Sequence, residues 1–341
     1  MHTDYDSSQE MREKMMEAAV VVTYRCNARC SMCGTWAHPT RREEEFPPGI
    51  LKKLPRLAFA NLTGGEPFLR EDLEEIVGIL SKRAERVVIS TNGYFTEKVV
   101  ALSERFPAAG IRISLEGLPA ANDELRGLKD GFDHGLRTLL ELRRRGRKDI
   151  GFGITVSDRN AADLLELYEL ARAMGLEFAT AVVHNSYYFH KHDNVIRGRE
   201  TVIGCFQELI RRLLKSRRIK DWFRAYFNYG LVNYVREKPR LLPCAAGSDI
   251  FFLDPFGEIR PCNGMAEESP ANSLGNLLRH SFDEIWNGER ARVIRERVRT
   301  CPRNCWMIGT AAPAMKKELL KPIRWIARNK IRVMMGREMK L

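Results

Sequence analysis

Between residues 18 and 183, short β-branched runs alternate with longer amphipathic stretches, and this alternation limits the fold more than any other feature. The segments between the runs carry apolar residues three or four positions apart, as one face of a helix does. Alternating strands and helices predict a parallel sheet covered by helices. Six such units are too few to close an eight-stranded barrel, so we expect an α/β fold built on a partial (β/α)6 TIM-like barrel. The predicted strands are AVVVTY (19–24), FANLT (59–63), RVVIST (86–91), IRISLEG (111–117), IGFGITV (150–156) and EFATAVV (177–183).

The pattern changes after residue 183. A polar and aromatic stretch, HNSYYFHKHD, is followed by basic helical segments and then by a stretch rich in Cys, Gly and Pro. Within that last stretch, IFFLDPFGEIRPC (250–262) predicts a hairpin, because its central DPFG is a turn signal. We therefore expect four parts: a barrel core over 18–183, a helical connection over 184–240, a small Cys-rich domain over 241–310 and a tail over 311–341.

Charge and hydropathy indicate where the protein works. No apolar run approaches the roughly 20 residues that span a bilayer, and the N-terminus lacks the layout of a secretory signal, so we expect a cytoplasmic protein. The formal net charge of the chain is +12. About +7 of it lies between Lys316 and Leu341, a segment that contains nine Lys and Arg and two Glu. Bases alternate there with Leu, Ile, Trp and Met, as in an interfacial helix. The hypothesis is a peripheral contact with the anionic inner face of the membrane; a solvated terminal helix is the alternative.

The eight cysteines fall into two groups, with Cys205 standing apart as an expected core thiol. Cytosolic thiols stay reduced, so grouped cysteines favour metal over disulfides. Cys26, Cys30 and Cys33 follow the first strand with the spacing Cys-x3-Cys-x2-Cys, at the strand ends where parallel folds place active sites. Three thiolates leave one iron of a four-iron cluster open to an external ligand. Zinc with a distant fourth ligand is the alternative. The second group consists of Cys244, Cys262, Cys301 and Cys305.

These motifs resemble the radical S-adenosylmethionine (radical SAM) superfamily, whose signature is this three-cysteine loop. LTGGEPFLR (62–70) resembles its Gly-Gly-Glu-Pro motif, and STNG (90–93), IRISLEG (111–117) and LRG (125–127) follow in the family's order. The resemblance implies that Cys26, Cys30 and Cys33 hold a [4Fe–4S] cluster. It also implies reductive cleavage of S-adenosylmethionine (SAM) to a 5′-deoxyadenosyl radical, which abstracts hydrogen from a substrate. The implied SAM contacts are Met32 at the adenine, Gly64, Gly65 and Glu66 at the amino group, Arg126 at a carboxylate, and Thr91, Asn92 and Ser114. Relatives often carry Asp where this chain has Glu116.

The second cysteine group resembles the SPASM/Twitch extension of that superfamily. The resemblance implies an auxiliary [4Fe–4S] cluster on Cys244, Cys262, Cys301 and Cys305. These are fewer cysteines than the full SPASM form carries, so the shortened Twitch form with one cluster is the better match. A zinc ribbon is the alternative, because four thiolates suit zinc. A fully ligated cluster cannot bind substrate, so we expect it to transfer electrons in a dehydrogenation, epimerisation or cross-linking reaction.

Candidate hydrogen or proton donors follow the sixth strand, over the expected mouth of the barrel. They are His184, Tyr187, Tyr188 and His190, with Asn185 and His192 beside them. A metal pair formed by His190 and His192 is an alternative to a simple surface loop.

The substrate is the least constrained part of the prediction. The leading hypothesis is an oxidoreductase or epimerase acting on a carbohydrate or related small molecule, including a lipid-linked saccharide of the cell envelope, with flavodoxin or ferredoxin as electron donor. The second is a maturase of a ribosomally made peptide, although peptide-modifying relatives often carry an N-terminal leader-binding domain and only a short segment precedes the first strand here. A zinc-bearing nucleic-acid-binding protein is the third. The concentration of charge in the tail and the lack of an aromatic and basic RNA-binding signature disfavour it, so no nucleic acid partner is expected.

Overall fold

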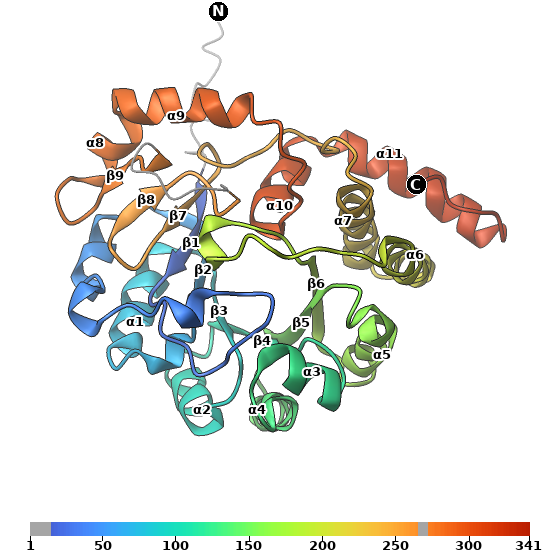
Figure 1. The fold of residues 1–341 in the computed structure, drawn as a ribbon, viewed down its shortest axis with the longest axis horizontal. Helices are drawn as coiled ribbons and strands as arrows, with labels where there is room; N and C mark the ends of the chain where they lie inside the picture. The colour runs from blue at the N-terminus through green and yellow to red at the C-terminus, as the bar shows by residue number, and fades with distance from the viewer. Residues whose placement is uncertain (1–14, 265–271) are drawn as a thin grey trace, which may run out of the picture.

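A single mixed sheet forms the centre of the molecule (Figure 1). The computed structural model describes residues 15–264 and 272–341. In that part of the chain the sheet has nine strands in the order β6-β5-β4-β3-β2-β1-β7-β8-β9. The first six are parallel, and each pairs with the next in sequence, which confirms the partial (β/α)6 barrel. They are β1 (Met16–Val21), β2 (Leu57–Thr63), β3 (Val87–Thr91), β4 (Gly110–Ser114), β5 (Ile150–Val156) and β6 (Glu177–Val182).

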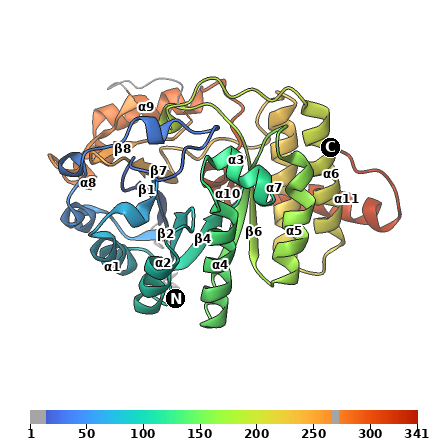
Figure 2. The ribbon, with the colours of Figure 1, turned by 60° about the horizontal axis from the view of Figure 1, so that its bottom comes forward.

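Helices surround the parallel strands on the outside (Figures 1 and 2). Consecutive residues of β1, such as Val20 and Val21, are both buried, although their side chains point to opposite faces of the sheet. Burial on both faces explains the unbroken apolar runs AAVV of β1 and VVI of β3. The surrounding helices are α1 (Leu73–Arg83), α2 (Thr96–Arg105), α3 (Pro119–Arg126), α4 (Gly131–Arg144) and α5 (Leu164–Ala173).

The first strand ends earlier than its sequence predicts. The run 19–24 predicts a strand through Tyr24, but β1 ends at Val21. Beyond it, the Tyr24 amide donates to Thr40 Oγ1 at 3.1 Å, and the Thr23 carbonyl accepts from Gly65. The chain has therefore left the regular ladder before it reaches the cysteine loop.

The Cys-rich segment continues the same sheet. β7 (Ile250–Leu253) pairs in parallel with β1, and β8 (Glu258–Arg260) turns back antiparallel to it, as the DPFG turn predicts. The domain boundary near residue 240 stays a prediction, and the β1–β7 pair crosses it. β9 (Gly275–Asn276) closes this edge, and the remaining helices are α6 (Arg199–Lys215), α7 (Ile219–Val235), α8 (Phe282–Asn287), α9 (Glu289–Arg299), α10 (Ile308–Lys317) and α11 (Leu320–Met334).

α6 and α7 form a helical hairpin beyond β6, and α11 lies against both of them at the edge of the molecule (Figure 1). Among the described residues, the structure contains no helix with the length and apolar character needed to cross a bilayer.

A glycine in α7 allows the segment after the last cysteine to dock on this hairpin. Trp306 is buried, and its indole Nε1 donates to the Phe227 carbonyl at 2.8 Å. A Cβ on Gly230 would collide with the Trp306 ring. By contrast, a Cβ on Gly204 of α6 would meet nothing within 4 Å.

We predict that Gly230→Ala lowers the thermal unfolding midpoint, with an overpacking cost of about 1–3 kcal/mol. The matched variant Gly204→Ala should keep or raise that midpoint, because Ala is the better helix former by about 1 kcal/mol. Differential scanning fluorimetry of both variants checks this. Equal midpoints for the two would contradict the packing argument.

Candidate active site

The first three cysteines lie on a loop that backbone hydrogen bonds fix to the last turn of α3. The amides of Arg29 and Ser31 donate to the carbonyls of Arg126 and Leu125, each at 2.8 Å. Gly127 ends α3 in the left-handed conformation, with φ of 54°. A Cβ there would lie 2.8 Å from the Arg29 carbonyl oxygen, so a larger residue would push the loop away.

The thiols of this loop lie close enough to influence one another's ionisation. Burial raises the pKa of Cys26 to about 12, and the neighbouring Cys30 thiol adds to the effect. Burial also raises the pKa of Cys30, while the Arg126 guanidinium opposes that rise. Iron coordination needs the thiolate form, so a nearby cation suits an anionic cluster at this loop.

The glycine pair after β2 lies directly against the end of β1. The Gly65 amide donates to the Thr23 carbonyl and the Glu66 amide to the Arg25 carbonyl, both at 2.8 Å. A Cβ on Gly65 would overlap the Arg25 carbonyl. The pair therefore permits a backbone contact immediately before Cys26. Contact of Gly64, Gly65 and Glu66 with the amino group of SAM stays a prediction.

The Glu66 carboxylate joins the ends of neighbouring strands. It is fully buried and accepts from Thr91 Oγ1 at 2.7 Å, the Asn92 amide at 2.7 Å and the Phe68 amide at 3.1 Å. Burial raises its pKa, against the effect of these three donors. Because both carboxylate oxygens are engaged within the chain, the Glu66 side chain positions the strand ends, together with Thr91 and Asn92. The Asn92 side chain in turn donates to Asn27 Oδ1 at 2.8 Å, next to Cys26.

Arg126 is a buried cation with an unused donor. Its NH1 group donates to Glu116 Oε1 at 3.1 Å, whereas its Nε is buried without a hydrogen-bond partner. Burial alone would lower its pKa, but Cys30, Glu116 and Cys26 raise it. An unsatisfied buried donor is costly, and a guanidinium can bind a carboxylate with two parallel hydrogen bonds. Arg126 therefore fits the carboxylate of SAM, and this contact stays a prediction. Ser114 is the last residue of β4, the strand that precedes α3 and Arg126, and its predicted contact with SAM also stays a prediction.

The loop after β6 crosses over to the cysteine loop. The Gly34 amide donates to the Phe189 carbonyl at 2.7 Å, and Asn194 Nδ2 donates to the Met32 carbonyl at 3.0 Å. The predicted adenine contact of Met32 stays a prediction. Asn185 closes the loop on itself through two hydrogen bonds with Asn194.

The structure separates the candidate donors of this loop. Burial raises the pKa of Tyr188, a hydrogen bond with Thr63 opposes that rise, and the Cys33 thiol adds to it. His190 stacks on His38 with ring centroids 4.7 Å apart and contacts the Tyr24 ring edge-on at 5.1 Å. The Tyr188 side chain therefore lies near Cys33, and the His190 carbonyl lies against Gly34 of the same loop.

Tyr187 lies next to His190, with ring centroids 5.8 Å apart. The Arg260 guanidinium covers the Tyr187 ring at 4.7 Å, His192 is exposed, and His184 lines a small cavity together with Cys305 and Trp306. His184 is thus next to the second cysteine group, and burial lowers its pKa. A catalytic role for these residues stays a prediction.

The four cysteines of the second group come together from separate segments. Burial raises the pKa of Cys262 to about 12, and the thiols of Cys244, Cys305 and Cys301 add to that rise. Among the described residues, no three His, Cys, Asp or Glu side chains converge as they would around a single metal ion. A four-iron cluster is larger and takes one thiolate at each iron. The half-buried Cys205 packs against the core from α6, outside both groups.

Two arginines close in sequence to the second cysteine group, Arg240 and Arg260, were not predicted as site residues. Arg240 donates to the carbonyls of Cys305 and Thr310 and lies over the Trp306 ring at 5.0 Å. Arg260 pairs with the buried Asp254 at 2.9 Å. The only feature of the sequence that could have indicated them is their spacing from the cysteines: Arg240 lies four residues before Cys244, and Arg260 lies two residues before Cys262.

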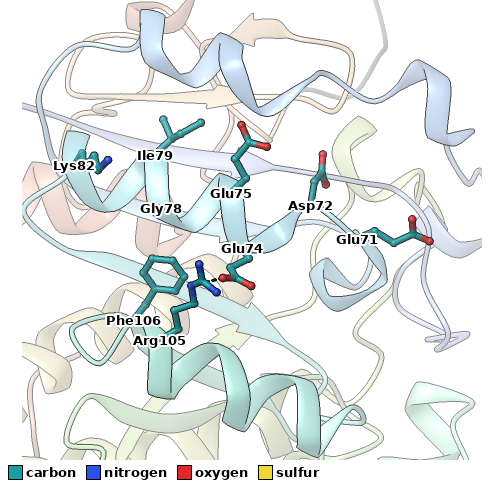
Figure 3. A pocket seen from close by; sticks show the side chains of 9 residues that line it. All are labelled: Glu71, Asp72, Glu74, Glu75, Gly78, Ile79, Lys82, Arg105 and Phe106. Atoms are coloured by element: carbon teal, nitrogen blue, oxygen red, sulfur yellow. Dashed lines mark ion pairs between the residues drawn. The ribbon is translucent and has the colours of Figure 1, made fainter.

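A hollow of about 520 Å³ lies on the flank of the molecule rather than at the strand ends (Figure 3). Its lining comes from α1, the residues just before it and the end of α2, and Glu74 pairs there with Arg105. None of its lining residues belongs to the cysteine loops, and we assign it no role in the chemistry.

Comparison with known proteins identifies the family. Residues 20–171 match the model of the radical SAM superfamily, and residues 244–306 match SPASM, an iron–sulfur cluster-binding domain. The chain belongs to the radical SAM superfamily. Its cofactors are SAM, the [4Fe–4S] cluster that binds SAM, and auxiliary iron–sulfur cluster binding in the SPASM domain. Iron–sulfur clusters thus replace the zinc sites that the sequence analysis left as alternatives. The individual ligands assigned above, and a single auxiliary cluster, stay predictions.

Three relatives illustrate the range of the family. AlbA of Bacillus subtilis, an antilisterial bacteriocin subtilosin biosynthesis protein, is 26% identical over 84% of this chain and 62% of its own length. The Fe-coproporphyrin III synthase of Methanosarcina barkeri is 31% identical over 44% of this chain and 39% of its own length. The chain thus spans less than two thirds of either protein. SuiB of Streptococcus suis, solved bound to its precursor peptide SuiA, has a TM-score of 0.61 at 14% identity over 84% of this chain and 67% of SuiB.

The two cysteine groups should fail differently when a ligand is removed. We predict that Cys30→Ala abolishes 5′-deoxyadenosine formation, whereas Cys262→Ala keeps part of it but loses product turnover. Each variant should also lose iron and sulfide relative to the parent. Formation of 5′-deoxyadenosine by anaerobically reconstituted, reduced Cys30→Ala protein would refute the ligand assignment.

Arg126 should contribute to SAM affinity through its free donor. We predict that Arg126→Lys, which keeps the charge but loses the planar pair of donors, weakens SAM binding at least tenfold, roughly the 1.5–3 kcal/mol of a charged hydrogen bond. The control Glu116→Gln leaves the guanidinium in place and should change the Kd only a few-fold. Equilibrium binding to reconstituted protein, with iron content and unfolding midpoint measured alongside, checks this. An equal loss in both variants would reduce Arg126 to a structural partner of Glu116.

Proposed function

We propose that this protein is a radical SAM maturase that modifies a peptide substrate. The supporting observation is similarity over more than four fifths of the chain, across both the barrel and the Cys-rich segment, to AlbA in sequence and to SuiB in fold. AlbA takes part in the biosynthesis of a bacteriocin, and SuiB has been solved with a precursor peptide. These relatives favour the peptide hypothesis over the carbohydrate oxidoreductase or epimerase, and over a lipid-linked saccharide as substrate.

The chain's own residues supply binding and orientation. Cys26, Cys30 and Cys33 would hold the cluster, which in its reduced form would supply the electron for cleavage of SAM to methionine and a 5′-deoxyadenosyl radical. The Arg126 guanidinium would hold the SAM carboxylate, while the backbone carbonyls of Gly64 and Gly65 would accept hydrogen bonds from its amino group. The Glu66 carboxylate keeps the ends of β2 and β3 in register with the cysteine loop through Thr91 and Asn92. The loop after β6 covers the cysteine loop and restricts access of water to it.

The second cysteine group would carry the electron that a modification reaction releases or consumes. Burial lowers the pKa of Arg240, and all four thiols of this group oppose that fall, so Arg240 lies close to them. Its positive charge would offset part of the negative charge of a thiolate-bound cluster. We propose flavodoxin or ferredoxin as the source of electrons.

A tetrapyrrole is the second candidate substrate. It is favoured by the 31% identity to the Fe-coproporphyrin III synthase, which is higher than the identity to AlbA but covers a smaller part of this chain.

An anaerobic substrate comparison tests the proposal. The reconstituted protein is incubated with SAM, a reductant and one candidate at a time: synthetic peptides copied from short reading frames beside its gene, Fe-coproporphyrin III, or a nucleotide sugar. We expect one peptide to raise 5′-deoxyadenosine formation several-fold above the substrate-free level and to change in mass. Deuterium from a labelled peptide should appear in the 5′-deoxyadenosine.

Two controls make the outcome decisive. Cys30→Ala protein should produce neither signal, because its cluster loop lacks one ligand. Consumption of Fe-coproporphyrin III or of the sugar, with every peptide unchanged in mass, would replace the peptide proposal by that substrate class.

A further inference from the structure

The C-terminal helix α11 presents two different faces. Its inner face packs against α6 and α7, where Trp325 stacks on Tyr229 with ring centroids 4.9 Å apart. Lys330 on its flank donates to the Leu214 and Ser216 carbonyls at 2.6 and 3.1 Å. The buried positions of this inner face are Pro322, Ile326, Asn329 and Val333.

A stripe of large apolar residues points away from that inner face. At 100° per residue, the stripe covers an arc of about 80° and its centre lies about 130° from the centre of the buried face. Burial against the rest of the chain therefore does not explain these side chains. They are Leu320 (67% exposed), Ile323 (44%), Ile331 (61%) and Met334 (67%), which we call the outer stripe.

Basic residues flank the outer stripe on both sides. On one side they recur every three or four residues along α11, at Lys321, Arg324, Arg328 and Arg332. On the other side lies the turn between α6 and α7, which Lys330 ties to α11. That turn exposes Arg217, Arg218 and the apolar Ile219 (63% exposed). Lys321 pairs with Glu318 just before the helix, at 2.7 Å. No Asp or Glu occurs between residues 319 and 337, so Arg324 and Arg328 have no acidic neighbour on their own helix.

This arrangement fits an anionic membrane surface. An amphipathic helix that lies in the interface buries its apolar face at the acyl boundary, and its Lys and Arg contact lipid phosphates. A second copy of the chain is a poorer match, because pairing two outer stripes would bring like-charged flanks together. A nucleic acid would leave the outer stripe without an apolar partner, and the nearby indoles of Trp222 and Trp325 are engaged within the protein.

We propose that α11, together with the α6–α7 turn, docks this protein onto an anionic lipid bilayer. The outer stripe inserts at the level of the acyl boundary, and the flanking bases contact the headgroups. The proposal does not depend on the substrate of the enzyme.

Co-sedimentation of the full-length reconstituted protein with vesicles tests this proposal. The vesicles are pure phosphatidylcholine, or equal parts of phosphatidylcholine and phosphatidylglycerol. We expect binding to the anionic vesicles to exceed binding to the neutral ones by at least about tenfold and to fall as salt is added.

Paired variants assign the binding to the surface named here. Arg324→Glu/Arg328→Glu and Ile323→Ser/Ile331→Ser should each lower the vesicle partition coefficient by about tenfold or more. Matched controls at exposed sites on α4 and α9, Arg143→Glu/Arg297→Glu and Leu140→Ser/Val293→Ser, should leave it unchanged. All eight substitutions in these four double variants are at exposed positions, and the unfolding midpoint verifies that each variant is folded.

Three results would overturn the proposal. The first is equal binding to both kinds of vesicle, and the second is an equal loss in the control variants. The third is the absence of vesicle binding combined with a different interaction that the α11 variants abolish. Light scattering would detect self-association of that kind, and fluorescence anisotropy with a single-stranded RNA oligonucleotide would detect nucleic acid binding.

Discussion

The end of β1 and the end of β2 approach so closely that main-chain groups contact each other directly. The carbonyls of Thr23 and Arg25 accept the amides of Gly65 and Glu66, and the glycine at 65 is required because a Cβ would overlap the Arg25 carbonyl. This contact fixes where the cysteine loop begins relative to the neighbouring strands. The Glu66 carboxylate carries the same constraint on to the end of β3, and the Arg126 carbonyl anchors the loop from the side of α3.

The sequence contained most of the barrel. Its six parallel strands are predictable because helices cover one face and the barrel interior the other, so most strands are short, largely apolar runs between amphipathic segments. The end of β1 was not predictable, since the apolar run continues while the Thr23 carbonyl already bonds to a distant segment. The pairing of β7 with β1 also had no local signal, because it joins segments more than two hundred residues apart.

The active site was predictable to the extent that its chemistry lies in short spacings. The cysteine loop and the glycine pair are such motifs. The engagement of the Glu66 carboxylate within the chain is not, because it depends on how close β2 and β3 come at their ends. The same holds for the buried pair of Asp254 and Arg260 and for Arg240. His184 illustrates the opposite failure: its position after β6 predicts a place over the mouth, whereas its ring lies beside Cys305.

The β1–β7 pair has a mechanical consequence. A parallel ladder cannot slide without breaking several hydrogen bonds at once, and β1 leads directly into the first cysteine loop while β7 leads through β8 to Cys262. Both sulfur-rich sites are therefore mounted on one rigid frame. A hinge between the barrel and the Cys-rich segment would have to break the β1–β7 ladder, so the sheet itself holds the first cysteine loop and the strand pair leading to Cys262 in a fixed relation.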